Sequence, residues 1–182
     1  MNVKTLMRSR LSIGAQALAT FCGIVLAVLL PQVFHLLGAA LGKGTGLGEM
    51  FLPMHLPVML VGLIAGPYIG GAVGLLSPLV SFWMTGMPGA KMLPFMMVEL
   101  CVYGIAMGVF SNMKGNIFLK VLGAQVLGRA ARAVAILLTV YAFHGQANVA
   151  SIWTSIPTGW PGLLIQWAAL IALGIYLRKK YE

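Results

Sequence analysis

The chain has 182 residues, of which 60% are hydrophobic and only 8% carry a charge. Soluble domains carry about 25% charged residues, so this composition excludes an ordinary soluble domain and predicts a protein of the lipid bilayer. Each membrane-spanning helix needs about 20 residues, which leaves room for about six of them.

Six apolar segments follow one another along the chain, separated by glycine, proline and polar residues. We expect each segment to form one membrane-spanning helix, which makes the fold class all-α and the whole chain, residues 1–182, a single integral membrane domain. The segments cover about residues 11–37, 52–68, 70–86, 93–112, 117–143 and 160–178.

The connections between these segments differ in length. The first segment is too long for the apolar core of a signal peptide, about 7–15 residues, so we expect it to be retained as a helix that Pro31 kinks or ends. The sequence GPYIGG joins the second and third segments so closely that they must form a tight antiparallel hairpin. A longer, uncharged loop with Trp153 and Trp160 is expected at about residues 144–161.

Most of the basic residues responsible for the formal net charge of +9 lie at the ends of segments. They are not interleaved with aromatic residues, and they form no basic stripe of the kind that binds nucleic acid. Because cytoplasmic loops retain positive charge, their distribution places both termini in the cytoplasm. The inner side then holds Lys4, Arg8, Arg10, Lys114, Lys120, Arg178, Lys179 and Lys180, and the outer side holds Lys43 and Lys91.

This orientation puts three sizeable loops on the outer face: the glycine-rich stretch GAALGKGTGLGEMF, the turn MTGMPGAKM and the loop after His144. The inner connections are short. The sequence therefore predicts a binding site that opens outward.

Glycines recur every four residues at positions 62, 66, 70 and 74. Small residues let membrane helices approach closely, so helix packing is favoured over ligand contact for this ladder. A second stripe, Ala15, Ala19, Gly23 and Ala27, follows one face of the first segment. It is suited to docking either against its own bundle or against a partner protein.

A polar stripe interrupts the fifth segment, where Gln125, Arg129 and Arg132 share one helix face. Glu99 lies in the fourth segment, and Tyr103 follows one turn later. Ionisable groups at this depth face the bundle interior or a watery cavity. A structural ion pair with Glu99 would account for one arginine only. A cavity with a polar ligand accounts for both, because guanidinium groups bind carboxylate or phosphate, and it is the favoured interpretation.

Other residues are candidates for the same site. His55, between two prolines at the outer start of the second segment, either caps a loop or contacts the ligand. Trp83 and Tyr103 could stack on a flat ring, although tryptophans near helix ends also form the ordinary interfacial belt. Gln166 is a further hydrogen-bonding candidate.

Catalytic machinery is not evident. The chain has three acidic residues in total, and it contains no phosphate-binding P-loop and no GxSxG nucleophile motif. Cys22 and Cys101 lie in apolar runs, and the three histidines are scattered, which argues against a disulfide or a metal site. We therefore expect no enzyme activity, no catalytic residue, and no cofactor or metal in this chain.

The run FLPMHLPVMLVGLIAGPYIGGAVGLLSPLVSFWMTGMP, followed by PFMMVELCVYGIAMGV, resembles the substrate-binding S-components of energy-coupling factor (ECF) transporters. The resemblance is specific across about residues 50–110. It implies a six-helix subunit that captures a vitamin or vitamin precursor from outside. It also implies partners, a transmembrane coupling protein and two cytoplasmic ATPases that use ATP. The family's AxxxA motif contacts the coupling protein and is matched by Ala15 and Ala19, with Gly23 extending the smooth face.

The resemblance does not name the substrate, since S-components share a fold while their pockets differ. Two deep arginines beside one glutamate favour a neutral or anionic molecule, and the aromatic residues favour a ring. The rival interpretation is a stand-alone secondary carrier of a small polar solute that uses Glu99 as its proton site.

Overall fold

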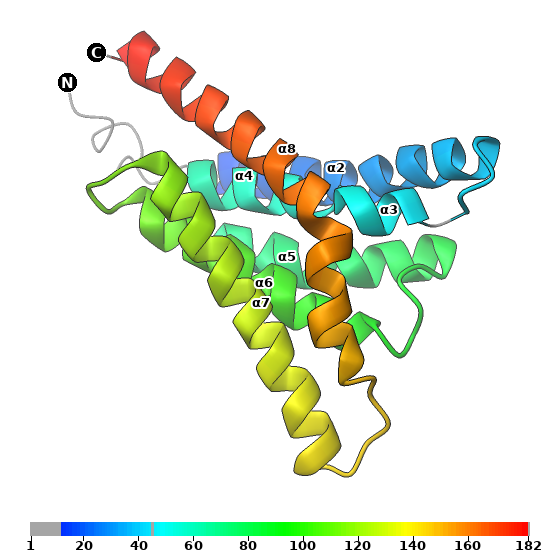
Figure 1. The fold of residues 1–182 in the computed structure, drawn as a ribbon. Helices are drawn as coiled ribbons and strands as arrows, with labels where there is room; N and C mark the ends of the chain where they lie inside the picture. The colour runs from blue at the N-terminus through cyan, green and yellow to red at the C-terminus, as the bar shows by residue number, and fades with distance from the viewer. Residues whose placement is uncertain (1–11, 45, 182) are drawn as a thin grey trace.

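The computed structural model describes residues 12–44 and 46–181, and this part of the chain is helical without strands. Six stretches are long and apolar enough to cross a membrane, with α3 and α4 together forming the second of them. The prediction of an all-α fold with six spanning helices is therefore confirmed. The helices are α2 (Ile13–Ala40), α3 (Gly46–Phe51), α4 (His55–Ala65), α5 (Pro67–Thr85), α6 (Leu93–Ser111), α7 (Ile117–Tyr141) and α8 (Ala150–Tyr181) (Figure 1).

Of the two alternatives predicted for Pro31, a kink or an end of the first helix, the end is excluded because α2 continues to Ala40. Most residues of α2 are not buried in the bundle. One boundary prediction was wrong. The sixth helix begins at Ala150, not at about residue 160, and so includes most of the predicted loop. The glycine-rich stretch after α2 also contains a short helix, α3.

Two prolines inside α8 explain why its first part was mistaken for a loop. Each proline removes one backbone hydrogen bond, but Pro157 and Pro161 are four residues apart and therefore lie on one face. Defects on a single face bend a helix without ending it. Figure 1 shows α8 changing direction part-way along its length.

The α4–α5 turn has the composition that its backbone needs. Gly66 ends α4 with φ at 91°, a left-handed region that favours glycine, and its amide still donates to the carbonyl of Gly62. Pro67 then begins α5 at a position where no amide hydrogen is required. The predicted tight hairpin is confirmed.

A glycine seam, defined here as Gly62, Gly70, Gly74, Gly104 and Gly108, brings α4, α5 and α6 into backbone contact. A methyl group added to Gly104 would collide with the carbonyl of Gly70, and one added to Gly74 would collide with the carbonyl of Leu100. The packing role predicted for the ladder in α4 and α5 is thus confirmed for three of its glycines, while Gly66 serves the turn.

The small-residue stripe of α2 faces its own bundle along much of its length. Ala27 is fully buried, and a methyl group on Gly23 would meet Val61 at 2.7 Å and Val73 at 3.2 Å. Gly23 therefore packs within the bundle, which corrects its prediction as a coupling-protein contact. Ala15 and Ala19, nearer the start of α2, are only half-buried.

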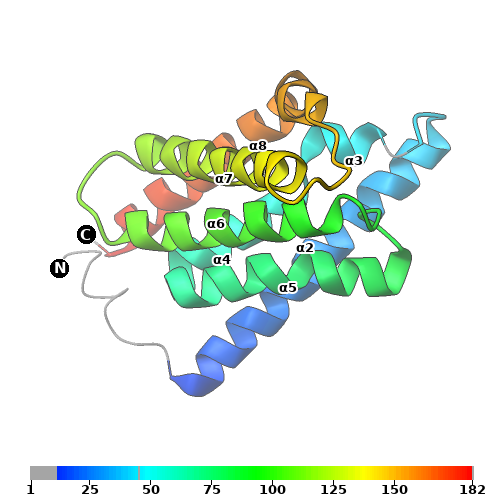
Figure 2. The same cartoon turned by 90° about the horizontal axis from the view of Figure 1, so that it is seen from below.

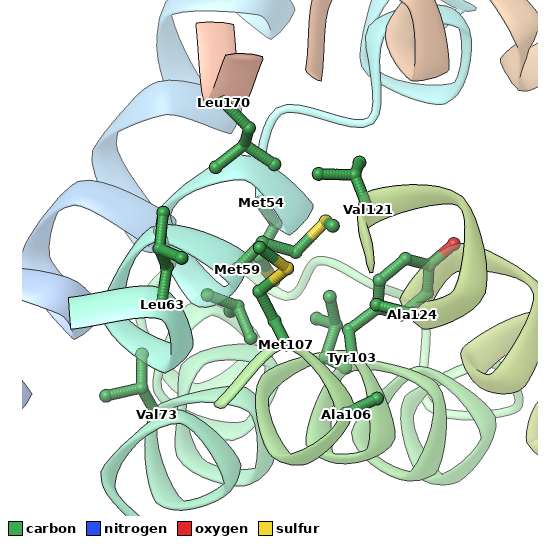
Figure 3. Close-up of a cluster of buried hydrophobic side chains, with 13 residues drawn as sticks. Met54, Met59, Leu63, Val73, Tyr103, Ala106, Met107, Val121, Ala124 and Leu170 are labelled. Carbon is green, nitrogen blue, oxygen red and sulfur yellow. The ribbon is translucent and has the colours of Figure 1, made fainter. Parts of the chain in front are cut away.

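The hydrophobic core takes residues from α2, α4, α5, α6, α7 and α8. Met59 and Met107 are fully buried at its centre, with Leu170 of α8 and Val121 of α7 closing it (Figure 3). The ring of Tyr103 borders this cluster, and its hydroxyl points away from the methionines (Figure 3). Unbranched methionines fill irregular gaps between helices that differ in direction.

The helices differ in direction in a way that shapes the site. In Figure 2, α5, α6 and α7 run close to parallel while α2 crosses obliquely behind them. In Figure 1, the far end of α7 and the first part of α8 diverge from the other helices and meet in a loop of their own. Residues of α3, α6, α7 and α8 together line a cavity.

Candidate functional site

The buried carboxylate of Glu99 lies close to three basic side chains from two other helices. Glu99, on the second turn of α6, is 1% exposed. Its Oε2 accepts a hydrogen bond of 3.2 Å from Nη1 of Arg132, and its Oε1 lies 3.2 Å from Nη1 of Arg129. His55, the first residue of α4, places its Nε2 3.5 Å from the same Oε1.

The two arginines of the predicted polar stripe thus come together with Glu99, and the geometry differs from a simple pair. Both arginines share the one carboxylate. The formal charge of the two arginines is +2 and that of Glu99 is −1, which leaves one positive charge in excess. A buried charge without a counter-ion costs several kcal/mol, which is why such groups adjoin a cavity or a ligand.

Tyr103 packs against His55 in this cluster. Its ring meets the ring of His55 edge to face, with centroids 5.0 Å apart, and it is fully buried. On its other side the ring lies so close to Gly128 of α7 that an added methyl group would collide with it. Tyr103 therefore positions His55, while its hydroxyl has no hydrogen-bond partner in the described structure.

A cavity of about 350 Å³ opens beside the cluster, within the size range of small-molecule sites. Residues of every helix from α2 to α8 line it, together with the α3–α4 and α5–α6 connections. Prolines and methionines make up much of its apolar wall, which includes Pro31, Leu52, Pro53, Met54, Met87, Pro88, Met92 and Met96. The polar lining residues are His35, Glu49, His55, Ser81, Glu99, Arg129, Arg132, Ser151, Thr154, Ser155 and Thr158.

A hydroxyl face on α8 was missed from the sequence. Ser151, Thr154, Ser155 and Thr158 follow one another at helical spacing and all line the cavity. The spacing was visible in the sequence, but the two nearby prolines made this segment look like a loop. With the helix extended to Ala150, these hydroxyls form one wall of the cavity that the charged cluster also lines.

Gln166 lies elsewhere than predicted. Its side chain is 1% exposed, does not line the cavity, and accepts a hydrogen bond of 3.1 Å from Gln125. Its own amide donates at 3.4 Å to the carbonyl of Leu52, whose backbone φ of 47° is unusual for leucine. Trp167 completes the amide network by donating to Gln125 at 2.7 Å. Gln125 and Gln166 therefore link α7, α8 and the α3–α4 connection.

Replacing Gln166 by leucine is expected to lower stability by about 1–3 kcal/mol, because Gln125 and the Leu52 carbonyl lose buried partners. Thermal unfolding of the purified protein measures this. Affinity for the ligand should change much less than stability. A large loss of ligand affinity at unchanged stability would show that Gln166 does contact the ligand.

Trp83 is also outside the cavity. Its side chain is 86% exposed on α5 and points to the surface, although Ser81 two residues earlier is buried and lines the cavity. Trp153 and Trp160 are exposed at 71% and 57%. The structure therefore assigns none of these three indoles to the cavity wall, and surface positions of this kind suit an interfacial belt.

The described residues contain no group of three or more His, Cys, Asp or Glu side chains that could hold a metal ion. What the cavity offers chemically is recognition, through a cationic end, a hydroxyl wall and apolar sides.

A family model described as "ECF transporter, substrate-specific component" matches residues 23–176.

The chain belongs to this family. No match was found among the curated proteins or the solved structures. The resemblance that rested on residues 50–110 is confirmed over a longer stretch, and the protein is a substrate-specific ECF component, a multi-pass membrane subunit of a transporter. Family membership also implies a small-molecule substrate and partners in the ECF module.

Proposed function

We propose that this substrate-specific ECF component captures a vitamin or a vitamin precursor in the 350 Å³ cavity and delivers it inward. The observation that carries the proposal is the cavity itself, which adjoins a buried charged cluster and is lined by residues from the predicted outer loops. The cavity volume suits a small molecule of this class.

Transport would require partners, as the family description implies. We propose a transmembrane coupling protein and two cytoplasmic ATPases, with ATP consumed by those ATPases and not by this chain. Both termini would face the cytoplasm of a bacterial cell, in whose membrane the chain resides. The basic residues at the C-terminal end support this orientation through the positive-inside rule.

The test is ATP-dependent uptake of the co-purifying molecule into cells or proteoliposomes, with and without the partner subunits. Uptake only in the presence of the complete module supports the proposal. Uptake by the purified chain alone, driven by a proton gradient, would instead establish the secondary carrier with Glu99 as proton site.

Replacing Ala15 and Ala19 together by leucine tests the proposed docking face. These residues are half-buried near the start of α2, and bulky side chains would prevent close approach of a partner helix. Ligand binding should persist, while module-dependent uptake should fall by roughly tenfold or more. Leu18→Trp, at a position that is already 63% exposed, is the matched control and should transport normally. Normal uptake by the double variant would refute the docking role.

A further inference from the structure

The charged cluster has more hydrogen-bond donors than acceptors. Both terminal nitrogens of Arg129 are buried without a hydrogen-bond partner, as are Nε of Arg132 and the two ring nitrogens of His55, of which a neutral imidazole uses one as a donor and one as an acceptor. Among the described residues of the cluster, the oxygens without a hydrogen-bond partner are Oε1 of Glu99 and the hydroxyl of Tyr103, which can donate as well as accept. Buried polar groups are normally satisfied, so this surplus of donors marks the place where a ligand supplies acceptors.

The two arginines have different tasks. Arg132 is 7% exposed and already donates to Oε2 of Glu99, so it balances the charge of that carboxylate. Arg129 approaches Glu99 at 3.2 Å without a hydrogen bond, and its side chain is 16% exposed toward the cavity. Its second terminal nitrogen lies beside Gly159 of α8, where a methyl carbon would be 3.2 Å away. Arg129 keeps its ion pair with Glu99 through Nη1, and it is the guanidinium of the two whose terminal N–H groups make no hydrogen bond within the described structure and can donate to a ligand.

The hydroxyl wall on α8 presents acceptors to the same cavity. The hydroxyl of Ser151 donates to the carbonyl of Asn148 at 2.6 Å, and that of Thr158 donates to the carbonyl of Thr154 at 2.8 Å. Because their protons are used within the helix, these oxygens offer lone pairs to the cavity. Glu49 of α3 adds a carboxylate to the same cavity.

We infer that the substrate is a small organic monoanion, whose single carboxylate binds Arg129 and whose hydroxyl or N–H groups face α8 and Glu49. This inference rests on the proposed function. One negative charge compensates the formal excess of one positive charge in the buried cluster, and Glu49 is left out of this sum because it is exposed and solvent screens its charge. A dianion such as a phosphate monoester would overcompensate it, and a cation would add to it. A planar carboxylate also matches the two parallel donors of a guanidinium.

The experiment starts from the full chain in lipid nanodiscs, purified from cells grown in rich medium. Native mass spectrometry detects the bound molecule, and methyl esterification counts its carboxyl groups. The expected result is one carboxyl group and no phosphate. A neutral, cationic or multiply charged molecule would overturn the inference and leave the transporter function standing. Capture of no molecule at all would overturn the proposed function, and the inference with it.

The second measurement is the affinity of that molecule and of its primary amide. The Arg129→Gln variant should bind the carboxylate about 30-fold more weakly or worse, while its affinity for the neutral amide should change little. Arg129→Lys keeps the positive charge without the paired guanidinium donors, so it should lose less affinity for the carboxylate than Arg129→Gln does. If Arg129→Gln fails to fold, the same two affinities are measured with Arg129→Lys. Lys43→Gln, at an exposed site, is the control for loss of one positive charge. Equal losses for carboxylate and amide would refute the assignment of Arg129.

Discussion

Replacing Glu99 by glutamine is expected to destabilise the protein by about 3–5 kcal/mol, because two buried guanidinium groups lose their shared counter-ion. For a chain of this size the melting temperature should fall by roughly 10 °C or more. The carboxylate also holds the arginines at their positions beside the cavity. Ligand affinity should therefore fall more than about tenfold, although the site becomes more positive.

Thermal unfolding and ligand titration in nanodiscs measure the two effects. Glu49→Gln is the matched control for stability, because Glu49 is exposed and the same change of charge there should alter stability by less than about 0.5 kcal/mol. Arg132→Ala should weaken binding to a similar degree as Glu99→Gln. Unchanged affinity in both variants would remove this cluster from the binding site.

Replacing Gly104 by alanine is expected to disrupt the α5–α6 contact, since the new methyl group would occupy the position of the Gly70 carbonyl. Overpacking usually costs about 1–3 kcal/mol, and the upper end is expected here because backbone atoms cannot rotate away as a side chain can. The ligand site should weaken as well, because Ser81 on α5 and Glu99 on α6 both line the cavity.

Gly14→Ala is the matched control, because no atom lies within 4 Å of the added carbon and the residue is helical. That variant should be neutral or stabilised by up to about 1 kcal/mol. Thermal unfolding of both variants tests the seam. Equal stability of the two alanine variants would show that the helices can separate without loss.

Much of the fold could be predicted from hydropathy, because spanning helices require long apolar runs. The boundary of α8 could not, because Pro157 and Pro161 usually indicate a break, whereas prolines four residues apart only bend the helix. The sequence also left open whether the small-residue stripe of α2 packs against its own bundle or against a partner protein. A small-residue face suits any helix partner, and only the packed structure shows Val61 and Val73 against Gly23.

The charged part of the candidate site was predictable, because ionisable residues are rare in apolar helices and must meet in the interior. His55, Glu99, Arg129 and Arg132 do meet there. Residues that are common in membrane helices carried no comparable signal. The predictions for Trp83 and Gln166 relied on residue type alone, and the structure places one at the surface and the other in an amide network.

The glycine seam lets helices touch because its residues have no side chains. The α8 hydroxyl face, in contrast, consists of the side chains of Ser151, Thr154, Ser155 and Thr158, and the two sets share no residue. The close packing of the helices and the hydroxyl wall of the candidate site are thereby encoded in separate parts of the chain. A library randomised at these four positions alone should yield folded proteins with altered ligand preference. The bundle offers a starting framework for engineering uptake of molecules that cells do not normally import.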